Sequence, residues 1–106
     1  AVPVTTLDAY ATEQQLTSIQ LLKLDVQGYE LEVLSGATRT LPNIDWVYAE
    51  AQFQELYVGA PLFQDVARFL RAHEFSLFRM GSFKWDQKGE LLECDMLFKN
   101  NRLSKS

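Results

Sequence analysis

The chain has 106 residues and a formal net charge of −4; 47% of its residues are apolar and 23% are charged. This composition is typical of one soluble globular domain, and no apolar run reaches the roughly 18 residues that cross a bilayer, so neither a disordered tail nor a membrane protein is expected. The Lys and Arg residues are scattered among carboxylates instead of forming a stripe, which argues against binding to nucleic acid.

The chain contains a single cysteine, Cys94. One thiol excludes an internal disulfide framework and fits a reducing compartment. We therefore expect a cytoplasmic protein.

The first part of the chain is predicted to form a strand, a helix and a second strand. A short strand is expected over 2–7, followed by a helix over about 9–18 that Asp8 caps. The nearly continuous apolar run over 19–26 is typical of a strand that is buried on both faces, as parallel strands are.

The middle of the chain repeats this alternation. Gly28 ends the strand, and apolar residues then recur at helical spacing over 31–41. Pro42-Asn43 ends this helix, and the apolar run over 44–50 predicts the next strand.

The last part is predicted to contain one helix and three extended segments. Apolar residues at helical spacing indicate a helix from Phe63 to about His73. The extended segments are expected at 75–80, 83–85 and 91–98, with a turn at 86–89 and a frayed polar terminus. Strands that alternate with helices and end in a hairpin-like pair predict an α/β fold, with a sheet that is parallel at first and antiparallel at its end.

Glycine spacing argues against a nucleotide-binding loop in this chain. The glycines lie at positions 28, 36, 59, 81 and 89, so no G-x-G pair exists for a dinucleotide fingerprint or a phosphate loop. No H-x-x-x-H or C-x-x-C pair supports a zinc site. The one histidine, His73, is expected to face solvent or to interact with the dipole at the end of its helix.

Three carboxylates are the first candidates for a site. Asp25 and Glu50 stand at the carboxyl ends of two predicted strands, and Glu30 lies in the first turn of the helix between them. Ligands of doubly wound sheets sit beyond the carboxyl ends of the strands, so these acids are candidates to converge on one rim. The alternative is that Glu30 only stabilises the start of its helix and that the other two are solvated strand ends.

One segment resembles a known family. Lys23-Leu24-Asp25-Val26-Gln27-Gly28-Tyr29-Glu30-Leu31-Glu32-Val33-Leu34 is similar to the K-[IL]-D-V-[EQ]-G-x-E-x-x-V-L signature of FkbM-type methyltransferases, with Gln27 in place of the commoner glutamate. The flanking matches are Val4-Thr5-Thr6-Leu7-Asp8, Glu50 with Tyr57-x-Gly59, and Cys94-Asp95-Met96-Leu97-Phe98.

This resemblance implies a fold and an activity. The fold would be a partial Rossmann-like sheet of the class I methyltransferases, and residues 1–106 would form a single α/β domain, the carboxyl-terminal half of such an enzyme. The implied cofactor is S-adenosylmethionine, and the implied reaction is O-methyl transfer to a hydroxyl of a sugar or another small metabolite. The family's glycine-rich cofactor loop has no counterpart here, so the chain alone is expected to be inactive.

The resemblance also implies roles for individual residues. Asp25 would lie near the transferring methyl group as a catalytic base or an acceptor-orienting group, with Glu50 as a second catalytic carboxylate. Glu30 and Tyr57 would bind the methyl acceptor, while Asp25 and Gly28 would contact the cofactor.

A partial sheet of this family has an uncovered edge and an uncovered face. The strand over 19–26 would lie beside an absent strand, and the helices present here would all pack on one face. Because a large exposed apolar patch is rare in monomers, we expect a homo-oligomer that forms by edge pairing, face packing or strand exchange.

Two other functions compete with the methyltransferase. One is a non-catalytic α/β module that binds a partner through the uncovered sheet. The other is a metal-dependent enzyme that holds magnesium through Asp25, Glu30 and Glu50, since hard cations take carboxylate oxygens.

Overall fold

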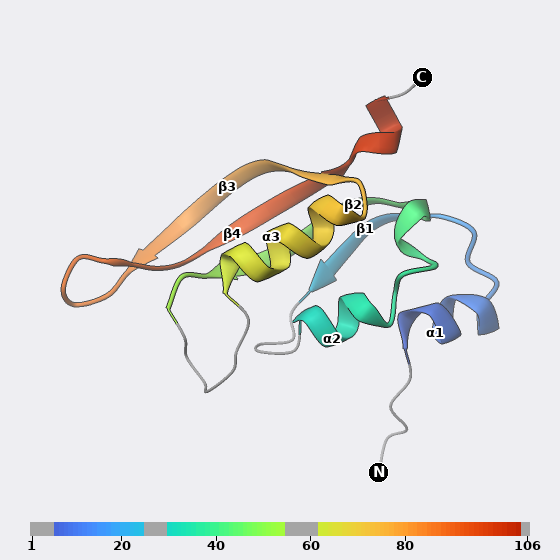
Figure 1. The fold of residues 1–106 in the computed structure, drawn as a ribbon, viewed down its shortest axis with the longest axis horizontal. Helices are drawn as coiled ribbons and strands as arrows, with labels where there is room; N and C mark the ends of the chain where they lie inside the picture. Colours follow the sequence, from blue (N-terminus) through green and yellow to red (C-terminus); the bar gives the residue numbers. More distant parts are fainter. Residues whose placement is uncertain (1–5, 25–29, 55–61, 105–106) are drawn as a thin grey trace, which may run out of the picture.

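The computed structural model describes residues 6–24, 30–54 and 62–104. These residues form an α/β fold in two layers, a mixed sheet and a layer of helices (Figure 1). The α/β class predicted from the sequence is therefore confirmed.

Four strands make up the sheet, in the order β1-β2-β4-β3. Their bounds are β1 Ile19–Leu24, β2 Ile44–Gln52, β3 Phe75–Trp85 and β4 Leu91–Asn100. The β1–β2 pair is parallel, and the β2–β4 and β3–β4 pairs are antiparallel. A sheet that begins parallel and ends antiparallel is what the order of elements predicts.

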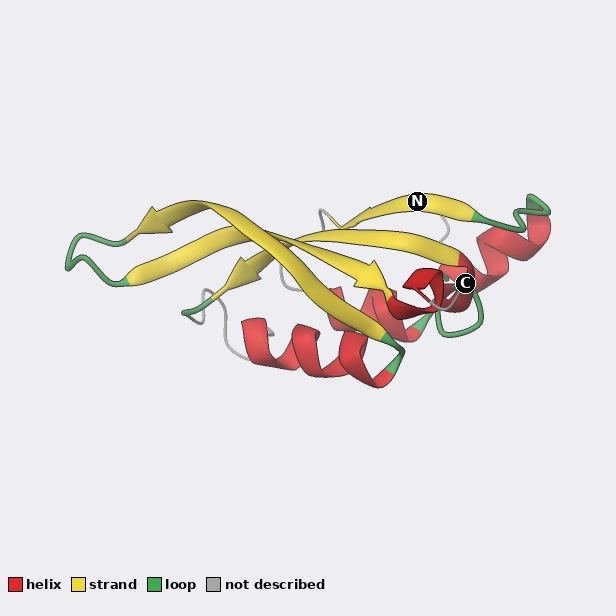
Figure 2. Ribbon diagram, turned by 90° about the horizontal axis from the view of Figure 1, so that it is seen from above, coloured by secondary structure: helices red, strands yellow, loops and turns green. Residues whose placement is uncertain are grey.

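The helices cover one face of the sheet. They are α1 Leu7–Glu13, α2 Glu30–Ser35 and α3 Phe63–Ala72. Two short 3-10 helices are also present, η1 Leu41–Asn43 before β2 and η2 Asn101–Ser104 after β4. Seen along the sheet, α2 and α3 lie on the same side of the strands (Figure 2). We call the other side of the sheet the open face.

The hydrophobic core lies between the sheet and the helices. Alternate residues of the two central strands point to the helix side because side chains in a strand alternate between faces. The buried side chains of this layer are Val47, Ala49 and Ala51 of β2, Cys94, Met96 and Phe98 of β4, Leu34 of α2, and Val66 and Leu70 of α3.

The start of the chain corrects one prediction. Thr6 caps the first helix, since its hydroxyl accepts a hydrogen bond from the amide of Ala9 at 3.1 Å, and the helix begins at Leu7. Asp8 is therefore inside the first turn and not the cap. Residues 6–7 are not part of a strand, the helix ends at Glu13, and residues 2–5 of the predicted strand lie outside the described residues.

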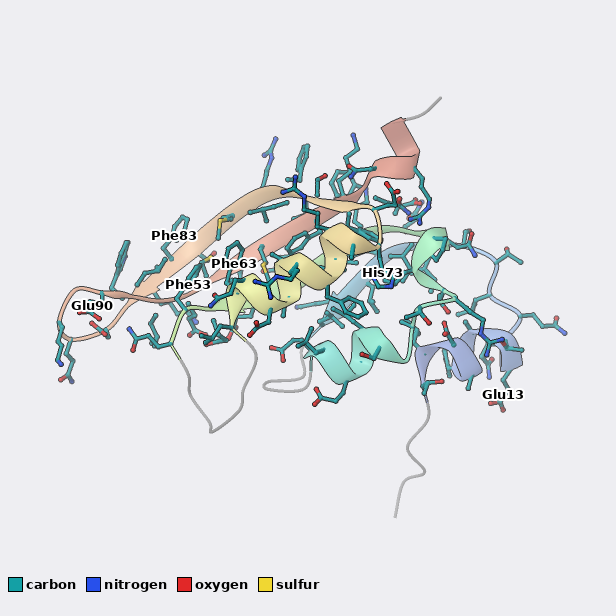
Figure 3. The ribbon with its side chains drawn as sticks, viewed as in Figure 1. Glu13, Phe53, Phe63, His73, Phe83 and Glu90 are labelled. Carbon is teal, nitrogen blue, oxygen red and sulfur yellow. The ribbon has the colours of Figure 1, made fainter. Side chains whose placement is uncertain are left out.

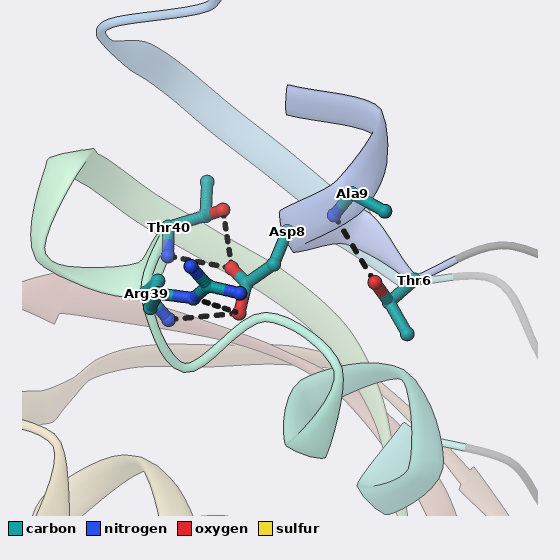
Figure 4. Close-up of polar contacts among 5 residues, drawn as sticks. All are labelled: Thr6, Asp8, Ala9, Arg39 and Thr40. Atoms are coloured by element: carbon teal, nitrogen blue, oxygen red, sulfur yellow. Dashed lines mark hydrogen bonds and ion pairs between the residues drawn. The ribbon is translucent and has the colours of Figure 1, made fainter. Parts of the chain in front are cut away.

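Asp8 has a different role, as an anchor between α1 and the segment before η1. Its carboxylate accepts hydrogen bonds from the amide of Arg39 at 3.0 Å and from the amide and the hydroxyl of Thr40 at 2.8 and 2.5 Å (Figure 4). The guanidinium of Arg39 lies 4.0 Å away. A carboxylate that accepts several hydrogen bonds holds the two segments together, although they are about 30 residues apart in the chain.

Three further boundaries differ from the predictions. The helix expected over 31–41 ends at Ser35, and turns lead from it to η1. The two extended pieces expected at 75–80 and 83–85 form one strand, β3, with irregular pairing around residues 77–85. The terminus expected to fray instead extends β4 to Asn100, whose buried side chain donates to the carbonyl of Ile44 at 2.8 Å.

The ends of α3 are fixed by aromatic contacts. Phe63 at its start stacks on Phe53, which follows β2, with ring centroids 5.3 Å apart (Figure 3). His73 ends the helix, stacks on Phe69, and has Nδ1 2.9 Å from the carbonyl oxygen of Phe69. This is a structural position at a helix end, and no role in a site follows from it.

Candidate functional site

The candidate site lies on the open face, at the carboxyl end of β2. Tyr48, Glu50 and Gln52 alternate with the buried alanines of β2 and so point away from the helices. In the antiparallel register, Glu50 lies opposite Asp95 and Gln52 lies opposite Glu93. Two strands thereby bring three carboxylates onto one part of the sheet.

Gln52 bridges two of these carboxylates. Its Nε2 donates to Oε1 of Glu50 at 2.7 Å and to Oε2 of Glu93 at 3.1 Å. The other oxygen of Glu93 lies 3.5 Å from Nζ of Lys84 on β3. The result is a chain of polar contacts that runs from β2 across β4 to β3.

Glu50 and Glu93 shift each other's pKa in opposite directions. The hydrogen bond with Glu93, followed by burial and the negative charge of Glu93, raises the pKa of Glu50 above its usual value. Hydrogen bonds from Glu50 and Gln52, with help from Lys84, lower the pKa of Glu93. Of the two, Glu50 is therefore the carboxyl that takes up the first proton.

A pocket of about 230 Å³ adjoins Glu50. Its lining residues are Lys23, Leu24, Tyr48, Glu50 and Asp95. The hydrogen bond from the hydroxyl of Tyr48 to Asp95 raises the pKa of Tyr48, and Nζ of Lys23 lies 5.7 Å from the centre of the Tyr48 ring. The pocket thus combines two carboxylates, one phenol and one ammonium group.

Glu30 lies on the other side of the sheet from this pocket. It begins α2 in the helix layer and is only 4% exposed. One of its oxygens, Oε2, has no hydrogen-bond partner among the residues that the structure describes. Glu30 thus comes from the helix layer and Glu50 from the sheet, and the convergence of Asp25, Glu30 and Glu50 on one rim stays a prediction, because Asp25 lies outside the described residues.

The remaining candidates of the sequence analysis, Asp25, Gly28 and Tyr57, lie outside the described residues. Asp25 and Gly28 follow β1 directly in the sequence, and β1 ends beside β2, where Leu24 is paired with Ala49. In the parts of the chain that are described, no group of three or more His, Cys, Asp or Glu side chains has the arrangement of a metal site.

Sequence reasoning missed Gln52, Glu93 and Asp95 as members of the site. Their signal is the alternation of polar residues in the strands 44–52 and 91–100, which places them on one face. Which residue faces Glu50, however, depends on the register between strands more than 40 residues apart. That register is visible only in the folded sheet.

Comparison with known proteins adds three findings. A family model described as the methyltransferase FkbM domain matches residues 1–77. A curated relative, the 2-O-methyltransferase NoeI of Sinorhizobium fredii (strain NBRC 101917 / NGR234), is 38% identical over 78 residues, a match that covers 64% of this chain. The same match covers 32% of that relative, so the chain spans about a third of its length. No solved structure matches the chain.

No helix among the described residues is long and apolar enough to cross a membrane.

Proposed function

The chain belongs to the FkbM methyltransferase domain family, and from this premise we propose that it takes part in transfer of a methyl group from S-adenosylmethionine to a hydroxyl oxygen of a small molecule. The family match confirms the resemblance inferred from residues 23–34. That match, over residues 1–77, is the observation that carries the proposal. An oxygen is the proposed methyl-accepting atom because the matched relative is named a 2-O-methyltransferase, and a hydroxyl of a sugar or another small metabolite is the acceptor that the family resemblance implies.

We further propose that the observed sheet is part of a Rossmann-like methyltransferase sheet and that the chain forms the carboxyl-terminal half of such a domain. The parallel β1–β2 pair followed by an antiparallel pair supports this assignment. The absence of a G-x-G spacing in the sequence supports a cofactor site to which this chain contributes only part.

The pocket beside Glu50 fits one feature of the cofactor. The sulfonium of S-adenosylmethionine is a cation, and the carboxylates of Glu50 and Asp95 favour a cation in the pocket that they line. When bound, the cofactor supplies an electrophilic methyl group. Asp25 and Gly28, which follow β1 in the sequence, would contact it from the neighbouring strand end.

The residues of this chain supply alignment and a proton acceptor, which are the two requirements of methyl transfer to a hydroxyl. Asp25 is the proposed base or acceptor-orienting group, with Glu50 as the second carboxylate. A pKa of Glu50 above the usual carboxyl value favours this role, because a general base works best when its pKa approaches the working pH.

Glu30 and Tyr57 are the proposed contacts of the methyl acceptor. Oε2 of Glu30 is buried and has no hydrogen-bond partner among the residues that the structure describes, and a donor hydroxyl of the acceptor would supply one. For the protein as a whole we propose a cytoplasmic location, since its single cysteine is buried in the core as a free thiol.

Calorimetric titration with S-adenosylhomocysteine tests the proposed function. We expect saturable binding that Asp25→Asn weakens by about tenfold, which corresponds to about 1.4 kcal/mol. Asp45→Asn is the matched control because Asp45 lies near the opposite end of β2. An affinity that is equal in the chain and in Asp25→Asn would remove Asp25 from the cofactor site, and no heat at millimolar ligand would argue against the function.

A second candidate function is a non-catalytic module that associates through the open face. The observation that favours it is an apolar surface on that face, where the rings of Trp46 and Phe78 meet edge to face at 5.1 Å. Beside them, a shallow hollow of about 440 Å³ is lined by Leu21, Trp46 and Leu97 among others. Exposed apolar surface of this kind favours a homo-oligomer.

A further inference from the structure

We propose that Glu93 is a positioning residue for Glu50, which it orients through Gln52 and with which it shares the proton that Glu50 takes up. This inference rests on the proposed role of Glu50 in methyl transfer. Glu93 lies beyond residues 1–77, the part of the chain that the family model matches, and so it is not among the residues from which the family was inferred.

The geometry links Glu93 to the Glu50 carboxyl group through Gln52. Both carboxylates accept from the same Nε2 atom of Gln52, at 2.7 and 3.1 Å, so the amide fixes their relative position. Lys84 holds the far oxygen of Glu93 at 3.5 Å. Contacts with Gln52 on β2 and with Lys84 on β3 thus fix the position of the Glu93 side chain relative to Glu50.

Burial makes these contacts effective. Gln52 is only 8% exposed, and the side chain of Glu93 is 17% exposed, so water competes weakly for their hydrogen bonds. Oε1 of Gln52 has no hydrogen-bond partner among the described residues, although it is buried. The Gln52 side chain is thus oriented by its two donor contacts with the carboxylates.

The charges around Glu50 come from every strand of the sheet. Glu93 and Asp95 face it from β4, Lys84 reaches the cluster from β3, Lys23 lines the same pocket from β1, and Tyr48 precedes it on β2. Among these groups, Glu93 is the first cause of the raised pKa of Glu50, and Lys84 only partly offsets it. Hydrogen bonds from Glu50 and Gln52, together with the ammonium group of Lys84, thus favour the ionised form of Glu93, while Glu50 remains the proton acceptor.

The proton balance of the proposed step is simple. S-adenosylmethionine would supply the methyl group, and it would lose its carbon–sulfur bond and its positive charge as the acceptor oxygen gains the new bond. The hydroxyl proton of the acceptor passes to the Glu50 carboxylate, where the hydrogen bond with Glu93 holds it until solvent removes it. No oxidant or further reactant is required.

Carbon-13 NMR titration of the glutamate carboxyl groups tests the inference on the chain as it is. We expect Glu50 to protonate at a higher pH than Glu93, and we expect Glu93→Gln to lower the midpoint of Glu50 toward the usual carboxyl value. Glu90→Gln, at an exposed position three residues earlier, should leave Glu50 unchanged. A high titration midpoint of Glu50 in Glu93→Asp, which keeps the carboxylate, would distinguish positioning by Glu93 from a general effect of the substitution on the fold.

Lys84→Gln provides a second test, because its side chain is 64% exposed and its loss should not disturb folding. We expect the midpoint of Glu93 to rise in this variant. A midpoint of Glu50 that equals that of an isolated glutamate, or that does not move in Glu93→Gln, would overturn the inference. The titration does not require bound cofactor, so failure to bind S-adenosylhomocysteine would count against the proposed function alone.

Discussion

Asp8 illustrates how one side chain joins distant parts of this chain. Burial works to raise the pKa of Asp8, but hydrogen bonds from the Thr40 hydroxyl and from the amides of Arg39 and Thr40 outweigh it, and the pKa lies below the usual value. A carboxyl group with a lowered pKa in the folded state stabilises the fold when it is ionised.

Asp8→Asn is therefore expected to lower the free energy of unfolding by about 1–3 kcal/mol at neutral pH, since hydrogen bonds to a charged acceptor are lost. The sign of the pH dependence follows from the lowered pKa. The difference in the free energy of unfolding between the unchanged chain and Asp8→Asn should persist above pH 3.8, the pKa of Asp in the unfolded state. It should shrink as the pH falls through the lower pKa of Asp8 in the folded state. Urea unfolding at pH 7 and at pH 3 measures the loss of stability and its dependence on pH.

Glu13→Gln is the control for Asp8→Asn, because Glu13 is exposed at the end of the same helix. An equal loss of stability in the two variants, or a loss in Asp8→Asn that does not change with pH, would contradict the anchoring role.

Glu50 is the residue for which sequence and structure together say most. Its place at the end of an apolar run predicts a strand-end carboxylate, and the structure confirms that β2 carries it to the open face. The structure adds its partners, Gln52 and Glu93, which raise its pKa and fix its position. Because like charges repel, the pairing of the Glu50 carboxylate with the Glu93 carboxylate does not by itself stabilise the fold.

At the scale of elements, close packing of α1 against the end of α2 depends on a glycine. The amide of Asp8 donates to the carbonyl of Gly36 at 2.8 Å, and a Cβ atom at Gly36 would lie 3.0 Å from Cβ and Cγ2 of Thr6. Contacts this short are tighter than most Cβ contacts, so a side chain at position 36 would push Thr6 away by a few tenths of an ångström. Glycine at this position avoids the crowding between the two helix ends.

Gly36→Ala is expected to reduce the free energy of unfolding by about 1–3 kcal/mol, the usual range for an overpacked site. Gly81→Ala is the matched control, because a Cβ atom there would meet nothing within 4 Å. Urea unfolding of the two variants tests the prediction. Equal stability of Gly36→Ala and Gly81→Ala would show that α1 is not packed as described.

Most elements follow from the local pattern of the sequence. The apolar runs over 19–26 and 44–50 predict β1 and β2, and the helical spacing after Phe63 predicts α3, because burial of these residues requires those periods. The predictions fail where two signals compete. Both Thr6 and Asp8 are good helix caps, and only the contact of Asp8 with Thr40 decides that Thr6 takes the role.

The candidate site is less predictable than the fold. Glu50 is accessible to sequence reasoning because it follows a buried run, but its partner Glu93 is 43 residues away, and the register of β2 with β4 decides that they meet. The face that Glu50 occupies is equally hidden from the sequence. A strand residue one position away points to the other face, and the face cannot be assigned without knowing where the helices pack.

At the scale of the whole molecule, the two faces of the sheet differ. Helices cover one face, whereas on the open face Leu21 is 53% exposed and Phe78 is 47% exposed. β1 also lies at the edge of the described sheet, where its one strand partner among the described residues is β2. Both features expose apolar groups that favour association.

Leu21→Lys is expected to weaken self-association, since it places a charge on the apolar part of the open face. Leu16→Lys is the control, because Leu16 is 44% exposed but follows α1, outside the sheet. Light scattering after size exclusion at micromolar concentrations measures the mass of each protein. A monomer mass for the unchanged chain would contradict the proposed association.

The central claim is that this member of the FkbM methyltransferase domain family contributes the carboxyl end of β1 and β2 to a methyl-transfer site. The most direct test is a two-dimensional amide NMR titration of the chain with S-adenosylhomocysteine. We expect the amides that shift to lie around Asp25 and Gly28 and in the pocket beside Glu50, and we expect Asp25→Asn to reduce the shifts. Shifts confined to other parts of the chain, or none at millimolar ligand, would contradict this role of the two strand ends.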